Sequence, residues 1–121
     1  MAKILLIDDD PDIRTVMGMI LKKEGYEVTT ASRREEALEK LAVEKPSLIL
    51  LDVLLSGADG RELCREIKAS DTTKNIPVIM LSGHPGAAQQ FETYGANDFL
   101  AKPFTTEVLL SKLSKQMGVV K

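Results

Sequence analysis

The sequence has little cysteine, no excess of basic charge and no long apolar run, and each shortage limits what the protein can be. Its single cysteine, Cys64, cannot form an internal disulfide, which fits a reducing compartment. The 16 basic and 18 acidic residues give a net charge of −2, and no run of Lys or Arg is interleaved with aromatic residues. This balance argues against a protein dedicated to binding nucleic acid.

The apolar runs are too short for a membrane segment. A spanning helix needs roughly 18 or more consecutive apolar residues, and no window of the sequence approaches that length. The first apolar run, residues 4–7, is followed at once by acidic residues, which is not the pattern of a signal peptide. We therefore expect a cytoplasmic protein without membrane contact, and 121 residues is the length of one domain.

Apolar runs alternate with amphipathic stretches five times, which is the pattern of strands separated by helices. Because the runs are almost continuously apolar, we expect a parallel sheet covered by helices on both faces. The predicted fold class is therefore α/β: a single doubly wound five-stranded parallel sheet with five helices. The strands are expected over 3–7, 26–31, 47–52, 76–82 and 98–102.

Start and stop signals bound the helices. Asp10 can cap the first helix, Pro11 suits its first position and Gly25 suits its end. The other signals are the capping patterns Ser32–Glu35 and Asp59–Glu62, a short helix near 87–94, and Thr105 or Thr106 before a last helix that reaches about Met117.

Helical spacing of apolar residues predicts which side chains of the first three helices face the sheet. Cys64 is one of them, and we interpret it as a small core residue because no histidine is near it in sequence. The predicted inward positions are Ile13, Val16, Met17, Ile20 and Leu21; Ala37, Leu38, Leu41 and Ala42; and Leu63, Cys64 and Ile67.

Reactive side chains stand at the carboxyl ends of four predicted strands. In doubly wound sheets, sites lie at this edge, where the strand order reverses. Crowded carboxylates raise one another's pKa unless a cation is present, and Mg²⁺ suits a site of one or two carboxylates. A carboxylate held against Mg²⁺ and a lysine can attack phosphorus, so the pattern predicts a phosphoryl-acceptor site. The residues at the four ends are Asp8, Asp9 and Asp10, then Asp52, Ser82 and Lys102.

Four segments together resemble the receiver domain of bacterial response regulators, the CheY-like family. They are "LLIDDD", "LILLDVLLSGADG", "VIMLSG" and "FLAKPFT", in the family's order and at about its spacing. The resemblance implies a flavodoxin-like sheet with strand order 2-1-3-4-5. It also implies a receiver domain over residues 1–121, with no output domain in this chain.

The resemblance implies a metal site and a phosphorylated residue. Asp8 and Asp9 match the acidic pair that holds Mg²⁺, with Mn²⁺ as an alternative ion. Asp52 matches the phosphorylated aspartate, which is also a metal ligand. Leu54 matches the position that supplies its backbone carbonyl to the metal.

The resemblance also implies a switch. Ser82 and Lys102 match the residues that contact the phosphoryl group, and Lys102 precedes a proline, Pro103, whose peptide bond is usually cis in the family. Phe99 matches the aromatic whose rotamer changes with phosphorylation as Ser82 turns inward. The output would be a changed surface on the fourth helix, fifth strand and fifth helix.

Three departures from the family pattern have consequences. Leu55 and Ser56 stand where the family often has Met and Pro, which predicts a more mobile loop. The stretch from Ser82 to Phe99 is shorter than is common, which predicts a short or reoriented fourth helix. Phe99 has no hydroxyl group, so no tyrosine hydrogen bond can stabilise either rotamer.

Two residues near the predicted site have competing interpretations. Asp10 is more simply a helix cap than a metal ligand. His84, the one histidine, is either an exposed loop residue or, with Leu54, a residue that controls the access of water to the phosphoryl group and so tunes its lifetime.

The alternative function is a small Mg²⁺-dependent phosphatase or phosphotransferase with Asp8 as nucleophile, since "IDDDPD" offers D-x-D after an apolar strand. Asp12 stands where that hydrolase motif commonly has Thr or Val, and the chain is too short for a cap domain. A flavodoxin-like binding module is disfavoured because acidic residues would repel a flavin phosphate. A calcium loop is disfavoured because Ile13 and Met19 replace its Gly and Glu.

We therefore expect a signalling switch, which as an enzyme catalyses only its own phosphorylation and slow dephosphorylation. Its phosphoryl donor would be a sensor histidine kinase or a phosphotransfer protein. Its targets would be a downstream protein, an attached output domain or a second copy of the chain. Nucleic acid and membrane are not expected to be direct partners.

Overall fold

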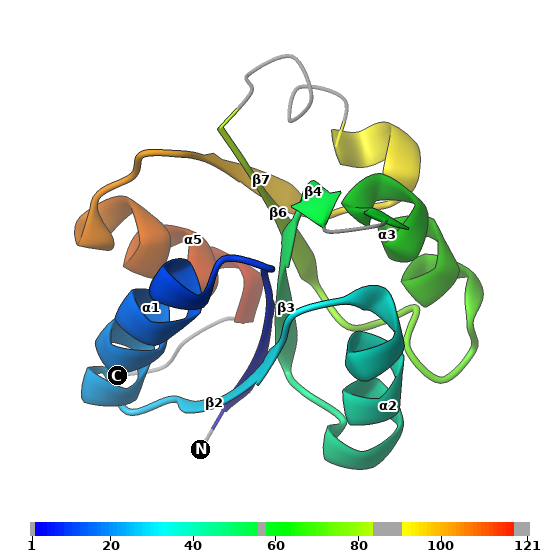
Figure 1. Cartoon of the computed structure of the whole chain (residues 1–121), viewed down its shortest axis with the longest axis horizontal. Coiled ribbons are helices and arrows are strands. Elements are labelled where there is room, and N and C mark those ends of the chain that lie inside the picture. The colour runs from blue at the N-terminus through cyan, green and yellow to red at the C-terminus, as the bar shows by residue number, and fades with distance from the viewer. Residues whose placement is uncertain (1, 56–57, 84–90, 118–121) are drawn as a thin grey trace.

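Runs of leucine, isoleucine and valine form a central parallel sheet in the computed structural model, which describes residues 2–55, 58–83 and 91–117 (Figure 1). Its strand order is β2-β1-β3-β6-β7. Counted along the chain among these five strands, the order is 2-1-3-4-5, so the predicted sheet and its order are confirmed. The strands are β1 (Lys3–Ile7), β2 (Glu27–Ala31), β3 (Leu48–Asp52), β6 (Val78–Ser82) and β7 (Asp98–Ala101).

Helices cover both faces of the sheet. Figure 1 shows α1 and α5 on one face and α2 and α3 on the other. A short antiparallel hairpin, β4 (Leu54–Leu55) and β5 (Ala58–Asp59), follows β3. The four α-helices within the described residues are α1 (Pro11–Lys23), α2 (Arg34–Glu44), α3 (Gly60–Ala69) and α5 (Thr106–Met117).

The expected helix near 87–94 is only partly within the described structure. Residues 84–90 lie outside it. The described part, Phe91–Tyr94, is a 3-10 helix, η1.

Alternating side chains of the buried strands feed two apolar layers. In β1, Leu5 and Ile7 pack with α2 and α3, whereas Ile4 and Leu6 pack with α1 and α5. All four side chains are fully buried, and burial of each contributes about 1.5–3 kcal/mol relative to exposure. Burial on both faces fixes the register of the strands, because a slip by one residue would exchange the two layers.

The helix caps follow the sequence signals with one exception. Asp10 accepts hydrogen bonds from the N–H groups of Asp12 and Ile13, and Thr105 accepts one from Val108 N–H. The predicted Ser32–Glu35 capping box is wrong. Glu36, one residue later, accepts from both the N–H and the hydroxyl of Ser32, because α2 begins at Arg34 and places Glu36 over that end.

Two predicted inward positions are also wrong. Val16 is 55% exposed, since the buried stripe of α1 runs through Met17 and Leu21 and Val16 lies to one side of it. Ala42 is exposed because α2 buries only Ala37 and Leu41 fully.

Within the described ranges, no helix combines the length and apolarity needed to span a membrane.

Gly60 allows α3 to begin directly against the backbone that follows β3. A Cβ atom at this position would overlap the main-chain oxygen of Asp52 and lie 2.9 Å from that of Val53. The N–H of Gly60 donates to the Val53 oxygen over 2.7 Å. The chain after Asp52 is therefore held against the first residue of α3.

We expect Gly60→Ala to lower the free energy of unfolding by about 2 kcal/mol or more, because the added methyl group must displace main-chain atoms. Urea unfolding followed by circular dichroism measures the change. Gly18→Ala in the middle of α1 is the matched control. A Cβ there meets no atom within 4 Å, so this variant should gain about 1 kcal/mol from helix propensity. Equal effects of the two substitutions would contradict the close approach at Gly60.

Candidate functional site

Three carboxylates meet at the carboxyl edge of the sheet, at the ends of two neighbouring strands. β1 and β3 pair in parallel, with Ile7 opposite Leu51, so the residues that follow them lie side by side. One oxygen from each of Asp8, Asp9 and Asp52 lies within 4.8 Å of the others. The structure therefore brings together the three acidic residues that the sequence predicted to converge.

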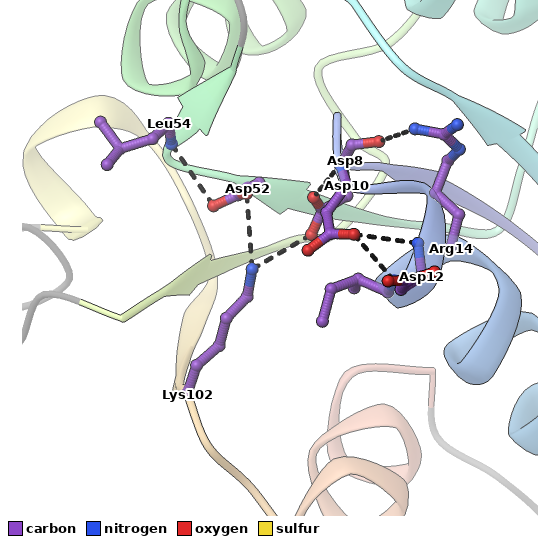
Figure 2. Close-up of polar contacts among 8 residues, drawn as sticks. Asp8, Asp10, Asp12, Arg14, Asp52, Leu54 and Lys102 are labelled. Carbon is purple, nitrogen blue, oxygen red and sulfur yellow. Dashed lines mark hydrogen bonds and ion pairs between the residues drawn. The ribbon is translucent and has the colours of Figure 1, made fainter.

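Asp8 is fully buried, and contacts with several elements fix its position (Figure 2). Its carboxylate accepts from Asp10 N–H over 2.9 Å and from Lys102 Nζ over 3.1 Å. Its main-chain carbonyl accepts from Arg14 Nη1 over 2.7 Å, and its N–H donates to Ala31 O over 3.0 Å. The turn from β1 into α1 is thus tied to α1, β2 and the end of β7.

Asp52 lies at the end of β3 with a carboxylate that faces both Asp8 and Lys102. Lys102 Nζ is 3.4 Å from its Oδ2, and Leu54 N–H is 3.4 Å from its Oδ1. Burial and the negative charge of Asp8 raise the pKa of Asp52 to about 6, although Lys102 and the Leu54 N–H act in the opposite direction. One ammonium group is therefore too little to neutralise two buried carboxylates.

Lys102 reaches the acidic residues from the opposite side of the site. It follows β7, and its N–H donates to the main-chain oxygen of Ser82 over 2.8 Å. Burial lowers the pKa of Lys102, but Asp52 and Asp8 more than offset this, so its pKa is raised. The ammonium form is stable at neutral pH. The Lys102–Pro103 peptide bond is cis, as the resemblance implies.

The donor set fits a hard divalent cation. Asp8, Asp9 and Asp52 offer only oxygen atoms, and with one lysine they leave an excess of negative charge. Asp9 is more exposed than Asp8, so its carboxylate can turn between solvent and an ion. Mg²⁺ retains water ligands and suits a site of this kind, and carboxylates also suit Mn²⁺.

Ser82 and Phe99 lie on the two strands beyond β3. Ser82 is 2% exposed at the end of β6, which pairs with β3 so that Leu81 lies opposite Asp52. Phe99 is half-buried in β7, and its ring centroid is 5.4 Å from that of Phe91.

The ion pair between Lys112 and Asp98 adjoins the Phe99 ring. Lys112 Nζ lies 5.2 Å from the ring centroid and 3.1 Å from Asp98 Oδ1. The same oxygen of Asp98 accepts the N–H of Phe99. Lys112 of α5 therefore contacts the Phe99 ring directly. It also contacts the Asp98 carboxylate that accepts the main-chain N–H of Phe99.

Other predicted residues divide into those outside the site and those outside the described structure. The Asp10 carboxylate faces the first turn of α1, which agrees with its interpretation as a cap. Leu54 directs its N–H at Asp52 and is 55% exposed. His84 and Ser56 lie outside the described residues. Cys64 is fully buried, and burial raises the pKa of its thiol to about 11, as expected for a core residue.

Arg14 and Gly60 support the site but were not predicted to do so. No sequence pattern relates Arg14 to the carbonyl of a residue six positions earlier. In the sequence, Gly60 is only the last residue of the matching segment "LILLDVLLSGADG". Its close approach to Asp52 depends on how α3 packs, which appears only in three dimensions.

Comparisons with known proteins agree with this arrangement. The family model of the response regulator receiver domain matches residues 4–114. The chemotaxis protein CheY4 of Vibrio cholerae is 34% identical, with a TM-score of 0.88, and the match covers 95% of this chain and 98% of that one.

Two further structures extend the comparison. The receiver domain of a sensor histidine kinase from Pseudomonas aeruginosa, with magnesium in its active-site cleft, is 32% identical with a TM-score of 0.88, and the match covers 98% of each chain. NtrX from Brucella abortus is 36% identical with a TM-score of 0.89. That match covers 97% of this chain but 27% of NtrX, so a similar unit occurs there within a longer protein.

The charge imbalance at Asp52 predicts a pH-dependent stability. The folded-state pKa of about 6 lies above the ordinary value of 3.8, so ionising Asp52 destabilises the folded state. We expect Asp52→Asn to be more stable than the wild type at pH 7.5 in the absence of divalent ions, by up to about 3 kcal/mol. The difference should grow as the pH rises from about 4 to 6 and should vanish below pH 4.

Urea unfolding at a series of pH values, in EDTA, measures this difference. Asp71→Asn is the control, because the Asp71 side chain is 94% exposed and should show no such dependence. A wild type that is more stable than Asp52→Asn at pH 7.5 would show that Lys102 fully compensates the two carboxylates.

Proposed function

Because the chain belongs to the response regulator receiver domain family, we propose that it is a phosphorylation-controlled switch that accepts a phosphoryl group on Asp52. The single observation that carries this proposal is the position of the Asp52 carboxylate. It lies at the edge of the site, where the ammonium of Lys102 bridges it to the buried carboxylate of Asp8. The donor would be a phosphohistidine on a sensor histidine kinase or phosphotransfer protein.

The chemistry follows from these groups. An Asp52 oxygen attacks phosphorus, the bond from phosphorus to the histidine nitrogen breaks, and an acyl phosphate forms on Asp52. Lys102 would stabilise negative charge on the phosphoryl oxygens, and Ser82 would donate a hydrogen bond to one of them. Mg²⁺ or Mn²⁺, held by Asp8, Asp9, Asp52 and the Leu54 carbonyl, would supply the remaining positive charge.

The proposed output is a conformational change and not turnover. Ser82 would move toward the phosphoryl group, and the Phe99 ring would move into the space beside it. Such a movement would break the present contacts of the Phe99 ring with Phe91 and Lys112. It would alter the surface that includes β7 and α5.

The proposal extends to the setting of the domain. Residues 1–121 would act as one receiver domain in the cytoplasm, without direct contact to nucleic acid or membrane. Its target would be a downstream protein, an attached output domain or a second copy. As an enzyme, it would catalyse only its own phosphorylation and slow dephosphorylation.

Phosphorylation with a small donor tests the acceptor residue. We expect incubation with acetyl phosphate and MgCl₂ to add one phosphoryl group to the wild type and none to Asp52→Asn, as measured by intact-mass spectrometry. EDTA should abolish the addition. Asp71→Asn is a matched aspartate control that should be phosphorylated like the wild type.

Peptide mapping separates this function from the alternative hydrolase. A phosphoryl group that persists in Asp52→Asn and maps to Asp8 would overturn the receiver proposal. The Asp8 side chain is fully buried, whereas that of Asp52 is 11% exposed, so we expect no phosphorylation on Asp8.

Leu54 should slow hydrolysis of the phosphorylated form. Its side chain is exposed beside Asp52 and has no group that could orient water. We expect Leu54→Asn to speed dephosphorylation severalfold, because an amide can position the attacking water. The decay of the phosphorylated mass after removal of the donor measures the rate. Leu54→Met should keep the wild-type rate, and an unchanged rate in Leu54→Asn would refute a role for this side chain.

A further inference from the structure

A groove of about 420 Å³ lies between α1 and the edge strand β2. β2 is the outermost strand at this end of the sheet. One stripe of α1, at helical spacing, and two alternate residues of β2 form its walls. The lining residues are Pro11, Arg14, Thr15, Gly18, Met19 and Lys22 from α1, with Val28 and Thr30 from β2.

The groove is basic on both sides of an apolar centre. Arg14 and Lys22 lie eight residues apart on α1, about 12 Å along the helix axis. Among the described residues, neither has a carboxylate within ion-pair distance, and no lining residue is acidic. Met19 and Val28 supply apolar surface between the two cations, and Met19 is 67% exposed.

Gly18 opens the centre of the groove. A glycine inside a helix costs about 1 kcal/mol relative to alanine, so packing within a protein often explains its presence. Here a Cβ would meet no atom within 4 Å, so no close contact in the chain requires glycine. The missing side chain leaves a notch in the helix surface that another molecule can fill.

We propose that this groove binds an acidic, amphipathic helical segment of a partner protein. Charge complementarity selects the occupant: two carboxylates about 12 Å apart, or seven to eight residues along a helix, would pair with Arg14 and Lys22. An apolar side chain between them would enter the notch at Gly18. The groove is distinct from the acceptor site, so this inference goes beyond phosphorylation and does not depend on it.

Arg14 places the groove next to the acceptor site. Its Nη1 donates to the Asp8 carbonyl (Figure 2). The same residue also lines the groove. A bound carboxylate would therefore act on a guanidinium that also holds the turn carrying Asp8 and Asp9. The partner segment and the acidic site share this one side chain.

Selection from a displayed library of 15-residue helical peptides tests the proposal. The library randomises the exposed positions and is selected against the full chain. We expect enriched peptides to carry two acidic residues seven or eight positions apart with an apolar residue between them. Titration of one enriched synthetic peptide into ¹⁵N-labelled protein should shift the amide resonances of Thr15, Gly18, Met19, Val28 and Thr30.

Two adjacent lysines provide a matched pair of variants. Lys22→Glu should weaken binding of the peptide about tenfold or more, whereas Lys23→Glu should change it less than about threefold. Both residues are in the last turn of α1, so the two changes have a similar effect on the helix dipole. Gly18→Leu should fill the notch and abolish binding while the helix keeps its stability, which thermal unfolding verifies.

Several outcomes would overturn the inference. These are enrichment of basic or neutral peptides, shifts confined to other surfaces, equal effects of Lys22→Glu and Lys23→Glu, or full binding to Gly18→Leu. Preferential binding of a single-stranded oligonucleotide in the groove would also overturn it. Asp52→Asn should bind the peptide normally, and Lys22→Glu should still be phosphorylated by acetyl phosphate, so the failure of either proposal is distinguishable from that of the other.

Discussion

The structure depends on an unequal balance of charge at the carboxyl edge of the sheet. Two buried carboxylates, Asp8 and Asp52, share the ammonium group of Lys102. Each comes from a different strand, so the balance exists only when β1, β3 and β7 are in their proper order and register. The apolar strands supply the energy that holds these charges together against their repulsion. The excess negative charge makes the edge a suitable place for a divalent cation.

The supporting contacts share a common character, because main-chain groups and not only side chains fix the site. Asp10 N–H holds the Asp8 carboxylate, Arg14 holds the Asp8 carbonyl, and the Lys102 N–H is bonded to Ser82. Substitution of one side chain therefore leaves much of this framework intact. This is why variants such as Asp52→Asn can separate charge from fold.

Much of this could be predicted from sequence because the signals are local. Continuous apolar runs mark buried parallel strands, and Asp10 and Thr105 mark helix starts by their hydrogen-bonding chemistry. Convergence of Asp8, Asp52 and Lys102 then follows from one rule about strand ends.

The features that sequence did not predict depend on packing between elements. Val16 has the right spacing for the core, but the rotation of α1 on the sheet exposes it. Glu36, and not the predicted Glu35, bonds to Ser32, because α2 begins one residue later than a capping box at Ser32 requires. Arg14 contacts the main-chain carbonyl of Asp8, and Gly60 approaches the main chain of Asp52 and Val53. Residue patterns contain no information about such contacts.

The contact of Gly60 with the backbone of Asp52 and Val53 makes the two sides of the site differ in how closely they are packed. On the α3 side, the main chain of Gly60 lies directly against the main-chain oxygens of Asp52 and Val53, so no space is left there for an added group. On the other side, Asp52 faces the side chain of Lys102, and the strands β6 and β7 lie beyond it. A group added to Asp52 would therefore be accommodated toward β6 and β7. The difference between the two sides would direct any displacement that starts at Asp52 toward the β6 and β7 end of the sheet.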